Sequence, residues 1–157
     1  MIRNQIEDVV KQLKAQPGYN QPSFLYGTAK ELNLMLDQSA FPVVMLYNLQ
    51  PVSKEFTLSN AISEKFSILM AFLFQTQFDQ FTRDNEIYVD MANAMCNEFL
   101  VKLSYYRETP YAARYFKIHE NDPAKSQPVY NKGDVNSTGV TLTISLSTMN
   151  NDNIIVP

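Results

Sequence analysis

The sequence predicts one α+β domain, in which a mixed, mainly antiparallel sheet has two main helices packed on one face. Three observations lead to this fold class. Two segments have apolar residues at helical spacing, one at the start of the chain and one near its middle. Strand-like segments follow each other directly between these helices, and another alternating segment comes after the second helix. Strands in consecutive runs favour antiparallel pairing over a parallel wound sheet.

The first predicted helix occupies the amphipathic N-terminal segment. Its apolar side chains recur at intervals of three and four along one helix face: Ile2, Ile6, Val9, Val10 and Leu13. This spacing indicates a helix with one buried side. Pro17-Gly18 is expected to stop it.

Three segments with strand character come next. Leu32–Asp37 alternates leucines with other residues, and Phe41–Leu49 is a short apolar run opened by Pro42. Phe66–Gln75 is the most apolar stretch, so we expect a central strand covered on both faces. The polar segment between the last two, Gln50–Lys65, is expected to form an extended hairpin or loop with some further strand.

The second helix has the clearest pattern in the sequence. Its predicted apolar stripe comprises Ile87, Met91, Ala94, Met95, Phe99 and Leu103. Thr82 or Asp84 is expected to cap its N-terminus, and Pro110 prevents further extension.

The remaining segments complete the domain. We expect a strand within Ala112–Ile118, a polar loop over Glu120–Asp134, and a half-buried strand in which Val140 to Leu146 alternate with Thr and Ser. The predicted domain therefore covers residues 1–147. Residues 148–157 are expected to form a flexible arm or an arm that docks on a neighbour.

Composition argues for a protein of the cytoplasm rather than of a membrane or the cell exterior. The net charge is −3, and Lys/Arg and Asp/Glu are mixed evenly along the chain, which disfavours general binding to nucleic acid. A single cysteine, Cys96, excludes an internal disulfide framework. The N-terminal segment is unlike a signal peptide, and the longest apolar run, Ile68–Phe74, is far shorter than a membrane span.

The candidate catalytic groups are solitary, so we expect no enzyme and no bound cofactor or metal. His119 is the only histidine, and the four glycines are isolated, without a phosphate-binding loop. The densest carboxylates are Asp79, Asp84, Glu86 and Asp90, which helix-start acidity explains in part. A nucleophilic Cys96 paired with His119 stays open as an alternative that coordinates can decide.

One stretch has the composition of a contact surface. Between Lys102 and Lys117, cations alternate with tyrosines, and the candidate partner contacts are Arg107, Tyr111, Arg114 and Tyr115. Aromatic and arginine side chains together are typical of protein–protein interfaces. The alternative function is a small accessory protein that binds nucleic acid through this stretch, because single-strand binders place cations beside stacking rings.

The order of the elements is similar to that of a known family. The amphipathic helix is followed by strands ending in FSILMAFLFQTQFDQ, then by the helix TRDNEIYVDMANAMCNEFLVKLSYY and the late strand DVNSTGVTLTISLS. This arrangement resembles the tail-terminator and head-to-tail connector (neck ring) proteins of tailed bacteriophages, including those of crAss-like gut phages. The resemblance covers nearly the whole chain and is one of element order and texture. The long polar segment Glu120–Asp134 departs from the family pattern.

The resemblance implies a structural virion protein without catalytic residues. It implies a homo-oligomeric ring at the phage neck or tail terminus, made in the bacterial host cytoplasm and surrounding part of the DNA channel. The implied partners are further copies of the chain and adjacent neck, portal-adaptor or tail proteins. Genomic DNA would pass through the lumen without sequence-specific binding, and no membrane would be involved.

Overall fold

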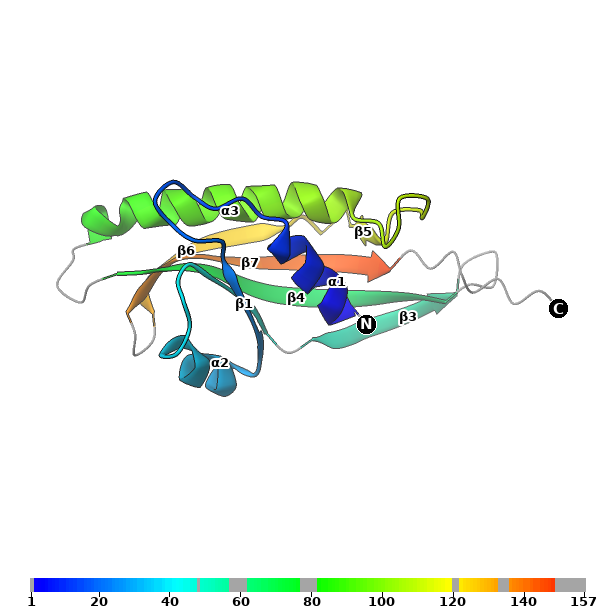
Figure 1. Cartoon of the computed structure of the whole chain (residues 1–157). Coiled ribbons are helices and arrows are strands. Elements are labelled where there is room, and N and C mark those ends of the chain that lie inside the picture. The colour runs from blue at the N-terminus through cyan, green and yellow to red at the C-terminus, as the bar shows by residue number, and fades with distance from the viewer. Residues whose placement is uncertain are drawn as a thin grey trace.

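The computed structural model describes residues 2–47, 49–56, 62–76, 82–119, 122–132 and 136–148. Helices and strands in the described residues follow one another as α1 (Ile2–Lys11), β1 (Ser23–Gly27), α2 (Ala29–Leu36), β2 (Val43–Tyr47), β3 (Gln50–Phe56), β4 (Ile62–Gln75), the 3-10 helix η1 (Thr82–Asn85), α3 (Glu86–Tyr105), β5 (Phe116–Ile118), β6 (Lys125–Lys132) and β7 (Ser137–Thr148) (Figure 1). The α+β class is confirmed.

The two longest strands, β4 and β7, form the centre of the sheet. They pair antiparallel from Lys65 opposite Ser147 to Gln75 opposite Ser137. On the outer edge of β4, β3 pairs with its first half and β2 with its second half, and β1 continues the sheet beyond β2. On the outer edge of β7, β6 pairs with its first part and β5 with its end. In the described strands, only the β1–β2 pairing is parallel.

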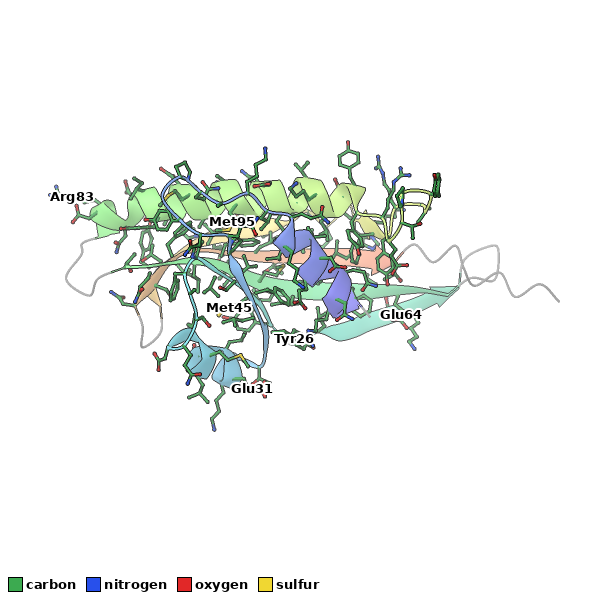
Figure 2. The ribbon with its side chains drawn as sticks, viewed as in Figure 1. Tyr26, Glu31, Met45, Glu64, Arg83 and Met95 are labelled. Atoms are coloured by element: carbon green, nitrogen blue, oxygen red, sulfur yellow. The ribbon has the colours of Figure 1, made fainter. Side chains whose placement is uncertain are left out.

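Helices α1 and α3 pack on one face of the sheet, as the sequence predicts, and α2 packs on the other (Figure 1). We call these the α3 face and the α2 face. Met95 of α3 belongs to the larger apolar core on the α3 face, and Met45 of β2 belongs to the smaller core under α2 (Figure 2). The alternation in β7 follows from this, because Val140, Leu142, Ile144 and Leu146 all face the larger core.

The segment predicted as a strand over Leu32–Asp37 is instead helical, which corrects the prediction. Leu32 and Leu36 are buried one helical turn apart, whereas Leu34 is 66% exposed. The helix starts with a capping box: the Glu31 backbone N–H donates to Thr28 Oγ1, and the Thr28 backbone N–H donates to Glu31 Oε2 at 2.8 Å. The Thr-x-x-Glu pattern was the sequence signal for this helix.

The polar loop predicted over Glu120–Asp134 is also wrong in its described part, since β6 lies there. Strand β6 pairs on one side with β7, and its side chains from Lys125 to Pro128 are exposed. An exposed edge strand can be polar and can contain proline, because no further strand needs the missing N–H. The strand predicted in Ala112–Ile118 shortens to β5, since residues 106–115 form a loop.

Three smaller corrections concern β4 and α3. Strand β4 is central but covered on both faces only in its second half, since Leu69 is 41% exposed on the α2 face. The buried stripe of α3 includes Met95, Phe99 and Leu103 as predicted, but also Ala92 and Cys96. Ile87 and Ala94, which the pattern assigned to that stripe, are exposed.

The predicted cap of α3 by Thr82 or Asp84 is not formed. Both residues belong to η1, and the N-cap residue Asn85 makes no side-chain capping bond. The 3-10 turn leads directly into α3, so the chain already has a helical direction where α3 begins.

Of the predicted C-terminal arm, Thr148 is the last residue of β7 and the remainder lies outside the described residues.

Candidate interaction surface

The loop over residues 106–115 joins α3 to β5 and brings its two ends together. The Tyr115 backbone N–H donates to the Tyr106 carbonyl at 2.9 Å, and the Ala112 N–H donates to the Thr109 carbonyl at 3.0 Å. Arg107 Nη1 donates to the Ala112 carbonyl at 3.1 Å. These bonds give the loop backbone a defined conformation, so its side chains start from defined points on the surface.

Three aromatic rings anchor this loop to the domain. The Tyr115 ring packs edge-on against Phe116, with centroids 4.7 Å apart, and Tyr106 lies 6.2 Å from Tyr115. The Tyr106 hydroxyl donates to Asp8 Oδ2 of α1 at 3.2 Å. Burial, followed by the Asp8 carboxylate, raises the pKa of Tyr106 to about 12, so this hydroxyl remains a donor at neutral pH.

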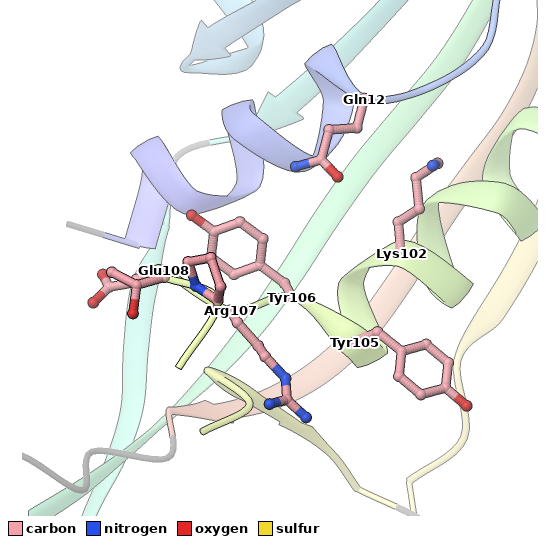
Figure 3. A pocket seen from close by; sticks show the side chains of 8 residues that line it. Gln12, Lys102, Tyr105, Tyr106, Arg107 and Glu108 are labelled. Atoms are coloured by element: carbon pink, nitrogen blue, oxygen red, sulfur yellow. The ribbon is translucent and has the colours of Figure 1, made fainter. Parts of the chain in front are cut away.

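A shallow pocket of about 390 Å³ lies between α1, the end of α3 and this loop (Figure 3). Its lining residues are Gln12, Lys102, Tyr105, Tyr106, Arg107, Glu108, Thr109 and Pro110. In Figure 3, the Tyr106 side chain points toward α1 and the Arg107 side chain points away from it. The pocket combines ring surfaces with charged groups of both signs, which suits contact with a peptide segment better than binding of a simple anion.

The structure brings the four predicted contact residues to this end of the molecule, but they are not equivalent. Arg107, Arg114 and Tyr111 are exposed, and Tyr111 is 98% exposed. The Arg114 guanidinium lies over the Tyr105 ring, 4.6 Å from its centroid. Tyr115 is half-buried among the anchoring rings, so its main role is to support the loop.

A second polar cluster lies on the α2 face and was not predicted. His119 Nε2 is 2.5 Å from Ser147 Oγ, and Ser145 Oγ donates to Asp122 Oδ2. The Ser145 bond lowers the pKa of Asp122, with help from nearby Lys65, Lys125 and His119. The only sequence signal was the row of hydroxyl residues alternating along β7.

The possible nucleophilic pair of Cys96 and His119 is not formed. Cys96 lies in the core on the α3 face. Ser147 follows Leu146 of that core by one residue, so it and the bonded His119 lie on the other face. Burial raises the pKa of the Cys96 thiol to about 12, which is the opposite of what a nucleophilic cysteine requires.

The carboxylates considered as a metal or acid–base site do not converge where they can be placed. Asp84, Glu86 and Asp90 are exposed at the start of α3, and Asp79 lies outside the described residues. Within the described ranges, no group of three or more His, Cys, Asp or Glu side chains is arranged to hold a metal ion. None of the helices in the same ranges has the length and apolar character needed to cross a bilayer.

Comparisons with protein-family models and with curated proteins gave no match for this chain.

Proposed function

We propose that this chain is a structural virion protein: one subunit of a homo-oligomeric ring at the head–tail junction or tail terminus of a tailed phage. In this role the ring surrounds part of the DNA channel. Its other partners are adjacent neck, portal-adaptor or tail proteins. The order of helices and strands that carries the family resemblance supports the proposal, together with the contact surface described above.

The observation that carries an assembly role is the loop over residues 106–115. It is tied to itself by backbone bonds and to α1 by the Tyr106–Asp8 bond, yet it holds Tyr111 almost fully in solvent. A tyrosine on an ordered loop adds a large contact area, and only two side-chain torsions have to be fixed on binding. Such a residue is suited to insertion into a neighbouring subunit.

The sheet edges favour contacts through loops and helices over extension of the sheet. Of the four outer strands of the described sheet, two contain a proline, with Pro51 in β3 and Pro128 in β6, whereas β1 and β5 have none. A proline removes one backbone donor, which protects an edge against pairing with another chain. Ring contacts through side chains are therefore expected.

Electron microscopy of purified particles and of recombinant protein tests the proposal. Rings from the pure protein, or its presence at the neck or tail of particles, are expected. Tyr111→Ala should reduce incorporation without changing the thermal unfolding midpoint, whereas Leu34→Ala, at an exposed position on α2, should not. A chain that stays monomeric and is absent from particles contradicts the proposal.

The second candidate function is nucleic-acid binding, and the Tyr105–Arg114 stack favours it. This ring and guanidinium lie beside Arg107 at one end of α3, an arrangement that can stack a base and hold a phosphate. A gel-shift at low salt with single-stranded DNA should then show binding that is lost on replacing Arg107 and Arg114 by Ala. Absence of a shift at low salt removes this candidate.

A further inference from the structure

Helix α3 has a second apolar side that faces solvent in the described part of the chain, with Tyr105 at its end covered on one ring face by the Arg114 guanidinium. Ile87 is 61% exposed, Val101 59% and Tyr105 61%, and Ala94 between them is also exposed. With about 100° of rotation per residue, these four side chains fall within about 20° of one line along the helix. The buried residues of α3, such as Phe99 and Leu103, lie on the opposite side.

Three positions of the exposed stripe are symmetric about Ala94. Ile87 precedes Ala94 by the same number of residues as Val101 follows it, whereas the position that corresponds to Tyr105 is Arg83. A small residue at the midpoint permits close approach of a second helix, at the short end of the usual interaxial distance of about 8–10 Å. The larger side chains then pack on either side of the crossing.

Charges at the two ends of α3 are opposite in sign. The N-terminal end has exposed Asp84, Glu86 and Asp90, with Arg83 as the nearby cation (Figure 2). The C-terminal end has Lys102, Arg107 and Arg114 against two carboxylates, so one positive charge remains. Glu98 pairs with Lys102 at 3.7 Å, and Glu108 accepts from Gln5 Nε2 at 2.8 Å.

We propose that α3 is a two-fold contact between copies of this chain, in which two α3 helices pack antiparallel and cross at Ala94. Ile87 of one copy then meets Val101 of the other. The acidic start of each helix lies over the basic end of its partner, and the helix dipoles oppose each other. A parallel pair would bring like charges together at both ends, which disfavours it.

A second copy fits this stripe better than an unrelated helix because the pattern complements itself. A two-fold contact requires one surface patch to match the same patch on the partner. The spacing of Ile87, Ala94 and Val101 meets that requirement, and Glu86 and Lys102, eight residues on either side of Ala94, are opposite in charge. Asp90 and Glu98, four residues on either side, are both acidic, and Glu98 is paired with Lys102 of its own helix. The crossing at Ala94 is distinct from Tyr111, the residue proposed for the ring contact, although Arg107 and Arg114 belong to both surfaces.

Disulfide trapping tests the register directly. Ala94→Cys should form a covalent dimer under mild oxidation, because the two introduced thiols meet at the symmetry axis. Asn93→Cys is the matched control, since that exposed residue is the next one along but points about 100° away. The native Cys96 is buried and should not cross-link in the unmodified chain. Equal trapping at both positions, or none at Ala94→Cys, overturns the proposal.

Sedimentation of the uncross-linked protein provides the second measurement. The unmodified chain should show a monomer–dimer equilibrium, and Val101→Glu should shift it at least tenfold toward monomer. Ile87→Lys should act in the same way, and circular dichroism establishes that both variants are folded. A dimer that both variants leave unchanged overturns the proposal.

Two further results separate the α3 contact from the proposed function. Rings formed by a chain that Ala94→Cys does not trap would remove the α3 contact and leave the ring role. A dimer that is trapped by Ala94→Cys, in a chain that is absent from particles, would retain the α3 contact and remove the ring role.

Discussion

The backbone of Gly139 in β7 packs directly on the carbonyl group of Phe72 in β4, and a Cβ built on Gly139 would overlap that oxygen. We therefore predict that Gly139→Ala destabilises the domain by about 3 kcal/mol or more, because a central strand must shift to make room. Chemical denaturation measures the change. Gly18→Ala is the control, because a Cβ at this position would meet no atom within 4 Å. Only its positive φ of 82° should then lower the free energy of unfolding, by about 1 kcal/mol. Equal losses at both sites would contradict the close packing of β4 on β7.

Helix α2 should depend on its capping box. Thr28→Ala removes the hydroxyl that accepts the Glu31 N–H, so we expect a loss of about 1 kcal/mol in the free energy of unfolding. Ser39→Ala is a suitable control, since Ser39 lies just beyond the helix and its hydroxyl donates to the Met35 carbonyl in the last turn. A larger loss in the control would show that the helix end, and not its start, limits stability.

The same box predicts a dependence on pH. The Thr28 backbone and hydroxyl bonds lower the pKa of Glu31 in the folded chain. The contribution of Glu31 to stability is therefore present above its ordinary pKa and is lost as the pH falls through the lowered value. In denaturation experiments across this acidic range, the free energy of unfolding should fall less for Glu31→Gln than for the unmodified chain. Parallel declines would mean that the Glu31 carboxylate is not bonded.

Cys96 should be unreactive in the folded protein. Its thiol is buried, and a pKa of about 12 leaves almost no thiolate at neutral pH. A thiol reagent such as Ellman's reagent should therefore label the chain only after denaturation. Rapid labelling of the native protein would show that the core beneath α3 opens readily.

Asp122 should titrate differently once its bond to Ser145 is removed. That bond is the main cause of the lowered pKa of Asp122, so Ser145→Ala should raise this pKa toward the ordinary value. Ser147→Ala is the matched control, because it removes the hydroxyl next to His119 and retains the one that binds Asp122. NMR titration of the carboxyl group distinguishes the two variants.

The elements that could be predicted are those with a long or strongly periodic pattern. Helix α1, β4, most of α3 and β7 each bury a face whose residues repeat at a recognisable interval. Strand β6 has no such interval, since it lies at an edge and its backbone pairing with β7 holds it in place. Helix α2 is short, and two of its three alternating leucines satisfy helical spacing equally well.

The contact surface could be predicted in part for a similar reason. Arg107, Tyr111 and Arg114 are close in sequence, so one loop necessarily gathers them. The His119–Ser147 and Asp122–Ser145 contacts join residues separated by 28 and 23 positions, and only the pairing of β5 and β7 brings them together. The apolar outer side of α3 was not predicted from the sequence. Ile87 and Ala94 lie three or four residues from Met91 in the sequence, so the helical spacing assigned them to the buried stripe.

The central position of β4 and β7 has a consequence for how the chain is made. Thr76 after β4 and Asn136 before β7 are bonded across 60 positions, so a growing chain exposes β4 long before its main partner has been synthesised. During that interval one edge of an apolar strand lacks its neighbour and can pair with other nascent chains. Closing so large a loop also slows folding. Slow translation or high expression should therefore favour inclusion bodies, and yield should depend on how soon β7 reaches β4.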